Sequence, residues 1–310
     1  ATLAVMMSVL FSPLSQAGQA WESYKARFFK PEGRIVDTGN GGVSHTEGQG
    51  FAMLMAVAND DKATFDKLWQ WTNRELKNKE NGLFYWRYNP AESNPVADKN
   101  NAADGDVLIA WALLKADARW HEKRYGAASD AITKALVAHS VIRYAGYRVM
   151  LPGVQGFKLE GEVVLNPSYF VFPAWQAFAG RSHLPVWRDL IKDGKRLLGK
   201  MGSGKADLPA DWVSLASDGK LEPAKGWPPR MSYDAIRIPL YLAWSDKQSP
   251  LLAPWKAWFG QFPREQTPAW VNVMTNEYAP YMMEGGLLAV RDLTMGQSPG
   301  EPEITFKDDY

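Results

Sequence analysis

Cysteine is absent from this 310-residue chain. Its absence excludes disulfide bonds, thiol nucleophiles and metal sites with cysteine ligands. Stability must therefore come from a packed core, for which 46% hydrophobic residues are sufficient. Histidine is also scarce, with 4 residues. An Asp-x-Asp metal site at Asp104 and Asp106 is therefore only weakly indicated, because no His or further acid lies directly beside the pair in the sequence. No cofactor is expected.

An excess of one charge sign and a long apolar run are also missing. Lys plus Arg number 35 and Asp plus Glu number 34, so no basic field predicts nucleic-acid binding. The apolar stretch at 3–14 is too short to span a bilayer and is followed by small-residue sites ending at Ala17 and Ala20. We interpret residues 1–20 as a truncated signal peptide. The mature protein is expected to be periplasmic or secreted, monomeric and not membrane-spanning.

Tryptophan, in contrast, is abundant, with 14 residues against 13 Phe and 12 Tyr. A core does not need this much indole, because the ring is bulky and its N–H requires a partner. Flat aromatic faces suit the C–H faces of sugar rings, but the same residues could anchor helix packing. Composition leaves both interpretations open.

Helical periodicity dominates the chain. Phe51, Leu54, Met55 and Ala58, for example, share one helical face. Helices are expected at 21–29, 51–58, 65–76, 104–120, 127–145, 168–180, 184–200, 232–246, 249–261 and 281–293. Strands are expected at 83–88, 147–151 and 163–165, with a hairpin around 218–219. We predict one all-α domain over 21–295 with a few short strands, followed by a loosely ordered polar tail at 296–310.

The first candidate for chemistry is Glu47, which follows a glycine-rich turn and opens a helix. Clustered glycines let the backbone approach a ligand closely. However, Ser44 and Glu47 also have the spacing of a capping box, in which the Glu side chain would satisfy a backbone N–H. Spacing alone does not separate catalysis from capping.

The second candidate is the pair Asp104 and Asp106 at the start of an apolar helix. A carboxylate here interacts favourably with the helix dipole and could cap the helix. Capping explains one Asp and leaves the other redundant. A carboxylate could instead accept a hydrogen bond from a sugar hydroxyl and hold a distorted ring.

The third candidate is Asp234, with Arg237 three residues later and Ser232 before it. Ser232 could cap the helix, and Asp234 and Arg237 could form an ordinary surface ion pair. An Asp kept ionised by Arg also suits a general base that activates water. Tyr169 lies at a similar loop-to-helix junction. In a barrel of helices, like-oriented helix starts gather on one face, which would bring these polar groups and Glu47 together.

Four ordered blocks of this sequence resemble those of glycoside hydrolase family 8. They are residues 45–53, 103–106 with 109–114, 166–170 and 232–237. The resemblance extends over about 21–293 and is strongest to the endoglucanases of bacterial cellulose-synthesis operons. It implies an (α/α)6 barrel, inverting hydrolysis of a β-1,4-glucan, and no metal.

The resemblance also assigns roles by position. Glu47 matches the general acid and Asp234 the general base, which in inverting enzymes lie about 6.5–9.5 Å apart. Asp104 matches the residue that helps to distort the sugar upstream of the cut. Further substrate-binding positions are Trp86, Tyr169, Tyr233 and Arg237. Ala103 departs from the Ser or Thr usual in the family, which leaves the geometry of that subsite less defined.

Three alternatives remain open at this point. The first is a polysaccharide lyase on a similar helical fold, which the scarcity of His disfavours. The second is a non-catalytic glucan-binding subunit of a cellulose synthase complex, which the presence of both Glu47 and Asp234 disfavours. The third is a family-8 enzyme acting on chitosan, xylan or mixed-linkage glucan. Besides the glucan itself, the cellulose synthase complex is the one partner that the resemblance raises.

Overall fold

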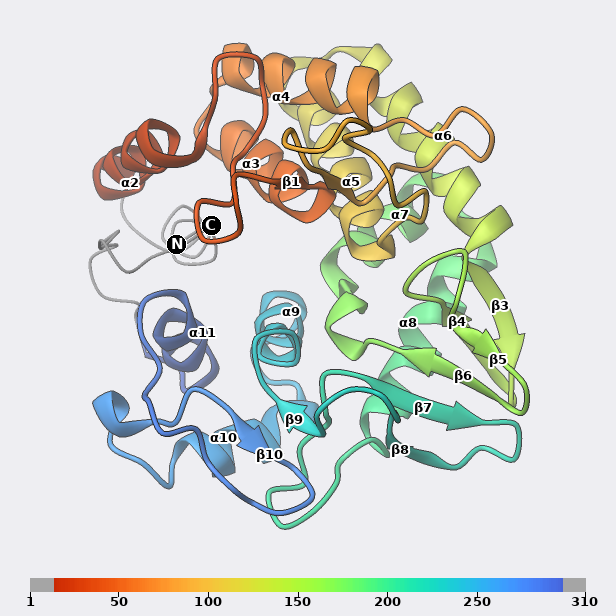
Figure 1. The fold of residues 1–310 in the computed structure, drawn as a ribbon, viewed down its shortest axis with the longest axis vertical. Coiled ribbons are helices and arrows are strands. Elements are labelled where there is room, and N and C mark those ends of the chain that lie inside the picture. Colours follow the sequence, from red (N-terminus) through yellow and green to blue (C-terminus); the bar gives the residue numbers. More distant parts are fainter. Residues whose placement is uncertain (1–13, 298–310) are drawn as a thin grey trace. The chain divides into compact units, whose positions relative to one another are not determined.

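The computed structural model describes residues 14–297, and these divide into two compact units. The first unit runs to His139 and the second begins at Ser140. Each unit has its own buried core, and the elements are labelled in Figure 1. The expected signal peptide falls partly outside the described residues, and positions 298–310 of the expected tail lie entirely outside them. The expected signal-peptide cleavage sites at Ala17 and Ala20 fall within the first described helix, and they stay predictions.

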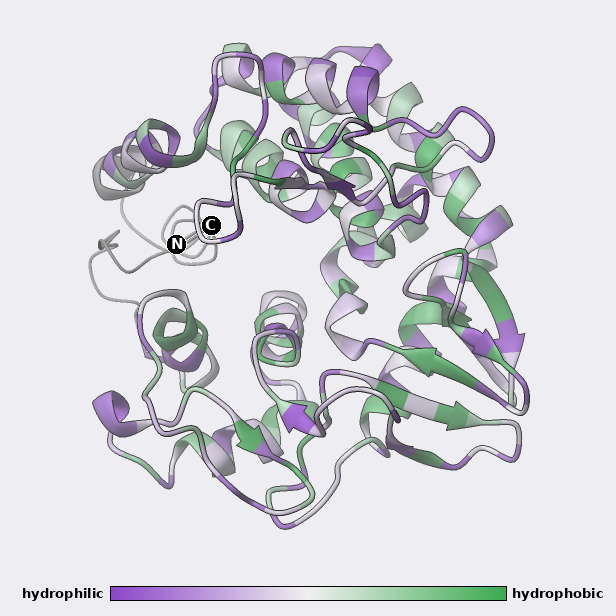
Figure 2. Cartoon of the chain, in the orientation of Figure 1, coloured by the Kyte–Doolittle hydropathy of each residue, from purple (hydrophilic) through white to green (hydrophobic). Residues whose placement is uncertain are grey.

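The first unit is built from helices and one short strand pair. The helices are α2 (Leu14–Phe28), α3 (Thr46–Ala58), α4 (Lys62–Glu75), α5 (Ala103–Trp120) and α6 (Lys123–His139), and the strands are β1 (Ser44–His45) and β2 (Arg87–Tyr88). Nearly all of α3 is buried, whereas α4 buries one side only. Figure 2 shows the same contrast in hydropathy. Helix α3 packs against α4 and α5, and α5 packs against α6, so α3 and α5 are central to this unit.

Close approach of α3 and α5 depends on glycine. A Cβ placed on Gly50 would lie 2.6 Å from the Leu108 Cβ, which is far inside van der Waals contact. Hydrogen in place of a side chain therefore lets the two central helices pack nearly backbone to backbone.

Helix α2 is attached to the start of α4 through Asp61. The Asp61 carboxylate accepts hydrogen bonds from Trp21 Nε1 at 3.0 Å, Lys25 Nζ at 2.8 Å and the N–H of Thr64 at 3.1 Å. Partial burial works against ionisation, but these bonds outweigh it and lower the pKa of Asp61 to about 2. The ionised N-cap of α4 thus fixes the position of α2.

The second unit mixes helices with short strands. Its helices are α7 (Phe172–Ser182), α8 (Pro185–Leu198), α9 (Arg237–Ser245), α10 (Ala253–Phe259) and α11 (Gly286–Thr294), with short 3₁₀ turns η1 (Pro167–Tyr169), η2 (Pro250–Leu252) and η3 (Arg264–Gln266). Its strands are β3 (Val141–Tyr144), β4 (Tyr147–Met150), β5 (Lys158–Leu159), β6 (Glu162–Leu165), β7 (Val213–Ala216), β8 (Leu221–Pro223), β9 (Arg230–Met231) and β10 (Val271–Asn272).

All strand pairings in the second unit are antiparallel. Strands β5, β6, β7 and β8 form a four-stranded sheet in that order, and β3–β4 and β9–β10 are separate pairs. Val163 and Leu215 are opposite each other in the sheet and are fully buried. The expected hairpin around 218–219 is confirmed as the β7–β8 connection.

The expected helix at 127–145 is wrong at its C-terminal end. Helix α6 ends at His139, and β3 pairs with β4 instead of continuing the helix. Ala145 and Gly146 both have positive φ, of 50° and 84°, as a two-residue hairpin turn with the correct twist requires. The β-branched residues Val141 and Ile142 then favour a strand over a helix.

Several other expected boundaries also shift. The expected helix at 168–180 is interrupted after the turn η1, and the helices expected from 232 and 281 begin later, at Arg237 and Gly286. The strand expected at 83–88 is reduced to β2, with an isolated bridge between Phe84 and Lys77. Within 14–297, no helix combines the length and apolarity needed to cross a bilayer.

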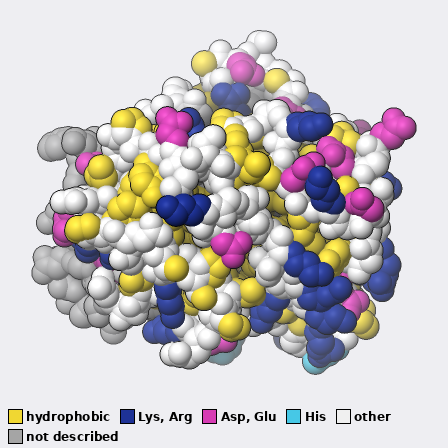
Figure 3. Space-filling model, turned by 90° about the horizontal axis from the view of Figure 1, so that it is seen from below, with side chains coloured by type: hydrophobic (Ala, Val, Ile, Leu, Met, Phe, Trp, Pro, Cys, Tyr) yellow, Lys and Arg dark blue, Asp and Glu magenta, His cyan; other side chains and the backbone are white. Residues whose placement is uncertain are grey.

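Charged side chains of both signs lie on the surface. Helix α8 exposes four basic residues, Arg188, Lys192, Lys195 and Arg196. On the face drawn in Figure 3, Lys and Arg side chains gather toward one side. Positive charge is therefore concentrated locally, although the whole chain carries a net charge of only +1.

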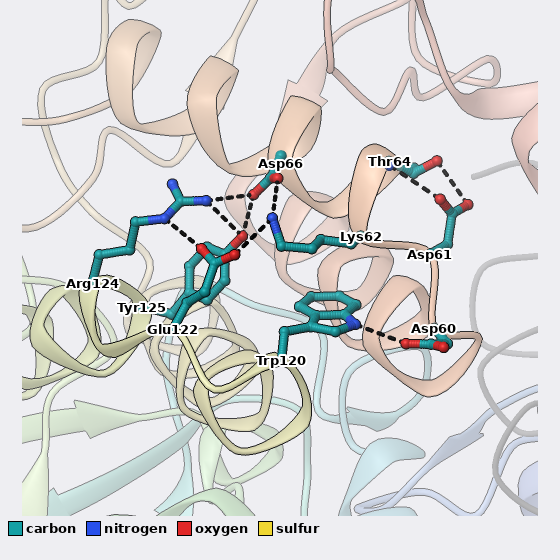
Figure 4. A network of polar contacts seen from close by, with 9 residues as sticks. All are labelled: Asp60, Asp61, Lys62, Thr64, Asp66, Trp120, Glu122, Arg124 and Tyr125. Carbon is teal, nitrogen blue, oxygen red and sulfur yellow. Dashed lines mark hydrogen bonds and ion pairs between the residues drawn. The ribbon is translucent and has the colours of Figure 1, made fainter.

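A polar network joins α4 to the start of α6 (Figure 4). Asp66 accepts hydrogen bonds from Lys62 Nζ at 3.0 Å and from the Tyr125 hydroxyl. Glu122 pairs with Lys62 at 3.0 Å and with Arg124 at 2.6 Å. Burial and the bond to Asp66 raise the pKa of Tyr125 to about 12. Because much of the network is exposed, it fixes geometry more than it adds stability.

Candidate active site

Glu47 lies in the first turn of α3, and the capping box that Ser44 and Glu47 could have formed is not present. The Ser44 hydroxyl lies in β1, donates to the Ile35 carbonyl at 2.6 Å and accepts from Arg34 Nη1 at 3.0 Å. The N-cap of α3 is His45, and no side chain caps the helix there. Tertiary hydrogen bonds thus engage Ser44 elsewhere, so Ser44 does not form a capping box with the half-buried Glu47.

The start of α5 is packed against the start of α3. A Cβ on Gly105 would lie 2.0 Å from Thr46 Oγ1 and 3.0 Å from the Glu47 nitrogen. The two helix starts therefore approach as closely as glycine permits. Asp104, which precedes Gly105, is 3% exposed and accepts the Gly105 N–H at 2.8 Å. The first unit thus brings Asp104 to the turn that carries Glu47.

Trp86 is held beside the same turn by backbone hydrogen bonds. The β1–β2 pair aligns His45 with Arg87, and the Thr46 N–H donates to the Trp86 carbonyl at 3.0 Å. The indole Nε1 donates to Asp98 Oδ2 at 2.8 Å. Backbone and side chain of Trp86 are both anchored, so the indole presents a fixed aromatic surface near Glu47.

His45 covers one side of that indole. The two rings are stacked, with centroids 5.6 Å apart and planes 13° apart. Burial lowers the pKa of His45, and the nearby Arg87 acts in the same direction against the opposing charges of Glu47 and Asp37. The imidazole is therefore neutral at neutral pH and stacks on Trp86 without adding a positive charge beside Glu47.

Asp106 has a structural role that the sequence did not reveal. It is fully buried and accepts hydrogen bonds from the Phe84 N–H at 3.1 Å and from Asn101 Nδ2 at 2.8 Å. Burial raises its pKa to about 7 despite these two bonds. No side chain caps α5, so neither Asp of the pair is its N-cap. Asp106 instead binds both ends of segment 84–101, which carries Trp86.

In the second unit, Asp234 lies in a turn immediately before α9. Arg237 Nη2 donates to Asp234 Oδ1 at 2.8 Å, and the two side chains are 12% and 32% exposed, respectively. The expected pairing of the two residues is confirmed. A half-buried guanidinium at this distance favours the ionised carboxylate.

Ser232 does not cap a helix, because α9 begins only at Arg237 and the Asp211 carboxylate accepts the Ala235 N–H that an N-cap at Ser232 would accept. The N–H groups of Ser232 and Ala235 both donate to Asp211 Oδ1, at 3.0 and 2.7 Å. The Ser232 hydroxyl donates to Asp211 Oδ2. Sequence reasoning missed Asp211 because it lies 21 residues before Ser232, and no local spacing links the two.

Aromatic side chains surround a cavity of about 190 Å³ next to this turn. Trp212 and Trp227 stack with centroids 4.8 Å apart, and Arg230 lies 3.7 Å from the centroid of the Trp270 ring. Tyr233, which is 53% exposed, shares a 2.6 Å hydrogen bond with the Tyr281 hydroxyl. The cavity offers flat faces and polar groups together, as sugar sites do.

The remaining expected residue, Tyr169, lies in η1. This turn packs against α9, and the Tyr169 ring meets Trp212 edge-on at 6.3 Å. The second unit therefore gathers Tyr169, Tyr233, Asp234 and Arg237 near the start of α9. Within residues 14–297, no three His, Asp or Glu side chains are arranged to hold a metal ion.

Residues 1–304 match the profile of glycosyl hydrolases family 8. The endoglucanase of Cellulomonas uda is 64% identical over 303 residues, which cover 98% of this chain and 84% of that protein. The structure of endoglucanase Cel10 from Klebsiella pneumoniae superposes with a TM-score of 0.93 and 66% identity over 94% of each chain. The structure of a family-8 endo-β-1,4-glucanase from an Achatina fulica gut metagenomic library superposes with a TM-score of 0.92 and 66% identity, over 94% of this chain and 92% of that one.

These similarities extend across both units and agree with the order of the four sequence blocks. They confirm the prediction of an all-α fold of the (α/α)6 barrel class with a few short strands. They also remove the lyase from consideration. The chain belongs to glycosyl hydrolases family 8 and is a glycoside hydrolase.

Proposed function

We propose that the chain is an inverting endo-β-1,4-glucanase in which Glu47 is the general acid and Asp234 the general base. The observation that carries the substrate class is its 64–66% identity, over nearly the whole chain, to proteins named as endoglucanases. The surroundings of the two carboxylates support the division of roles between them.

The base must be ionised to accept a proton from the attacking water. The 2.8 Å contact between Arg237 and Asp234 supports this state, because the guanidinium stabilises the carboxylate. Water deprotonated by Asp234 would attack the anomeric carbon from the side opposite to the leaving oxygen, which inverts its configuration.

The acid must carry the proton that the leaving oxygen receives. Glu47 is half-buried, and Gly105 at the start of α5, next to Asp104, packs against the same turn. An ionised Asp104 near Glu47 would disfavour ionisation of Glu47 and so would help it keep its proton. Asp104 would also accept a hydroxyl hydrogen bond from the distorted sugar upstream of the cut. Trp86 would provide a platform for a neighbouring glucose.

The polar and aromatic residues of the second unit would bind further glucose units. Tyr169, Tyr233 and Arg237 are assigned to the substrate on this basis, together with the aromatic cavity beside Asp234. Arg230 and Asp211 both line this cavity, so its charge does not separate cationic chitosan from a neutral glucan. Chitosan, xylan and mixed-linkage glucan are the alternative substrates.

The test compares wild type with Glu47→Gln and Asp234→Asn on carboxymethyl-cellulose. Wild type should lower the viscosity well before reducing ends accumulate, because an endo-enzyme cuts within chains. Each isosteric variant should lose about 10³-fold in rate, the size of a general acid or base contribution. Matched controls are Glu80→Gln and Asp218→Asn, which alter exposed carboxylates and should leave the rate unchanged.

Two results would overturn the proposal in different ways. No release of reducing ends by wild type would remove cellulose-like glucan as the substrate. Full activity of either variant would remove that residue from the catalytic pair. Inversion is tested separately by proton NMR of cellohexaose cleavage, in which the α-anomer should be the first new reducing end; a β-anomer would contradict inversion.

Export and a role in cellulose synthesis are also part of the proposal. The resemblance to endoglucanases of cellulose-synthesis operons supports a periplasmic or secreted, monomeric protein acting on newly made glucan. In this role the protein would act together with the cellulose synthase complex.

A further inference from the structure

Asp234 owes its position to an irregular piece of backbone. The Ile236 N–H donates to the Ser232 carbonyl and the Arg237 N–H donates to the Asp234 carbonyl, both at 3.0 Å. Helix α9 begins only at Arg237, so Asp234 lies in the turns before it. Backbone N–H groups at such a junction have no helical partner and need an acceptor from elsewhere.

Asp211 provides that acceptor on both sides of Asp234. Its Oδ1 accepts the N–H groups of Ser232 and Ala235, and its Oδ2 accepts the Ser232 hydroxyl. Because one carboxylate joins residues two before and one after Asp234, it defines the path of the backbone between them. A shift of Asp211 would therefore change where the Asp234 carboxylate points.

Asp211 is itself firmly anchored. It is 9% exposed, and its own N–H donates to the Arg230 carbonyl of β9 at 2.8 Å. Trp212 follows it and accepts the Ala224 N–H at 2.9 Å, just before β7 begins at Val213. The carboxylate thus extends from the edge of a sheet, which is a more rigid base than the loop that it holds.

We propose that Asp211 is a positioning residue for the general base: it holds the 232–236 turn so that Asp234 keeps its contact with Arg237. This role rests on the proposed function of Asp234. Asp211 acts through the backbone and takes no proton in the reaction. It is buried with a raised pKa, since burial outweighs the hydrogen bonds and the charge of Arg237.

The test uses variants that separate positioning from charge. Asp211→Ala removes all three hydrogen bonds. Asp211→Asn keeps an oxygen for the two backbone N–H groups and offers its NH₂ group to the Ser232 oxygen. Asp218→Ala is the matched control, because Asp218 accepts the Lys220 N–H at 3.0 Å in an exposed turn of the same unit.

The readouts are kcat, KM and the pH dependence of kcat/KM on cellohexaose, with thermal unfolding to confirm the fold. Asp211→Ala should lower kcat by roughly 10- to 100-fold with little change in KM, as expected for a displaced catalytic group. Loosening of the Asp234–Arg237 contact should also move the acidic limb of the pH profile to higher pH. Asp211→Asn should restore most of kcat, and Asp218→Ala should match wild type.

The outcomes distinguish this role from general stabilisation. A folded Asp211→Ala variant with unchanged kcat and pH profile would overturn the inference, as would an Asp211→Asn variant that is equally impaired. If Asp211→Ala does not fold, Ser232→Ala provides the test. This variant removes one of the three bonds, so it should lower kcat and shift the acidic limb of the pH profile. A Ser232→Ala variant with unchanged kcat and pH profile would overturn the inference. If Asp234→Asn is inactive and Asp211→Ala has wild-type kcat and pH profile, the positioning role of Asp211 alone is refuted. If Asp234→Asn is fully active, the proposed role of Asp234 as general base is refuted.

Discussion

Asp104 and Asp106 are two residues apart at the start of one helix, yet their surroundings give them different roles. Asp104 precedes Gly105, which packs against the turn that carries Glu47, whereas Asp106 holds Phe84 and Asn101. The pKa of Asp106 is raised to about 7 by burial, although hydrogen bonds and Lys77 oppose the shift. Ionisation of Asp106 in the folded protein is therefore unfavourable.

The raised pKa predicts a pH-dependent contribution to stability. Because the folded protein holds the Asp106 proton more tightly than the unfolded chain, this contribution is full below pH 3.8 and is lost as the pH rises through about 7. Urea unfolding of wild type and Asp106→Asn at pH 5 and pH 8 measures it. Relative to the variant, wild type should lose about 3 kcal/mol between the two pH values. A difference that is constant, or that favours wild type at pH 8, would contradict the burial argument.

Single residues were predictable where chemistry depends on neighbours in sequence. The Asp234–Arg237 pair follows from their spacing and is confirmed. The alternative that Ser44 and Ser232 cap their helices was wrong, because Ile35 and Asp211 engage the two hydroxyls. Asp211 itself could not be found, since its role depends on contacts that local periodicity does not encode.

At the scale of elements, the central pair α3 and α5 determines how Glu47, the proposed general acid, and the start of α5 with Asp104 are placed. Both helix starts meet at Gly105, where a Cβ would lie 2.5 Å from the Thr46 Cβ. The side chain of Glu47 and the start of α5 can therefore be brought together only while position 105 lacks a side chain.

Gly105→Ala is expected to separate the two helix starts. The overlap should cost about 2 kcal/mol in unfolding free energy and should also lower kcat, because Glu47 moves relative to Asp104. Gly180→Ala in α7 is the matched control: its Cβ would meet nothing within 4 Å, and it should gain up to about 1 kcal/mol from helix propensity. Thermal unfolding and cellohexaose kinetics of both variants provide the check. An unchanged unfolding temperature and an unchanged kcat in Gly105→Ala would contradict the claim that the close contact at position 105 positions Glu47.

Long amphipathic helices were predictable, as were the strands at 147–150 and 162–165 and the β7–β8 hairpin, whereas strand β3 and several helix ends were not. The 3.6-residue period identified α4, α5 and α8, since packing and propensity agree there. The β3–β4 hairpin was missed because the apolar pattern continued past His139 and the turn depends on positive φ at Ala145. Helices α9 and α11 begin late because tertiary contacts engage the segments before them. The N–H groups of Ser232 and Ala235 donate to Asp211, and the Met283 N–H donates to the Thr267 carbonyl.

For the whole molecule, the sequence blocks, the fold class and the family agree. With no cysteine and a net charge of +1, neither crosslinks nor a strong field dominates, and the hydrophobic cores of the two units must hold the structure. The family was predictable because four motifs occur in order. The proposed mechanism assigns opposite proton transfers to two carboxylates on different elements, Glu47 and Asp234.

Cleavage of 2,4-dinitrophenyl β-cellotrioside by wild type, Glu47→Gln and Asp234→Asn tests these opposite roles most directly. The dinitrophenolate leaves without protonation, so the variant lacking the general acid should approach wild type to within about 10-fold on this substrate while staying roughly 10³-fold impaired on cellohexaose. The variant lacking the general base should be strongly impaired on both substrates, because water still has to be activated. Equal impairment of the two variants on the activated substrate, or rescue of Asp234→Asn instead of Glu47→Gln, would contradict the assignment.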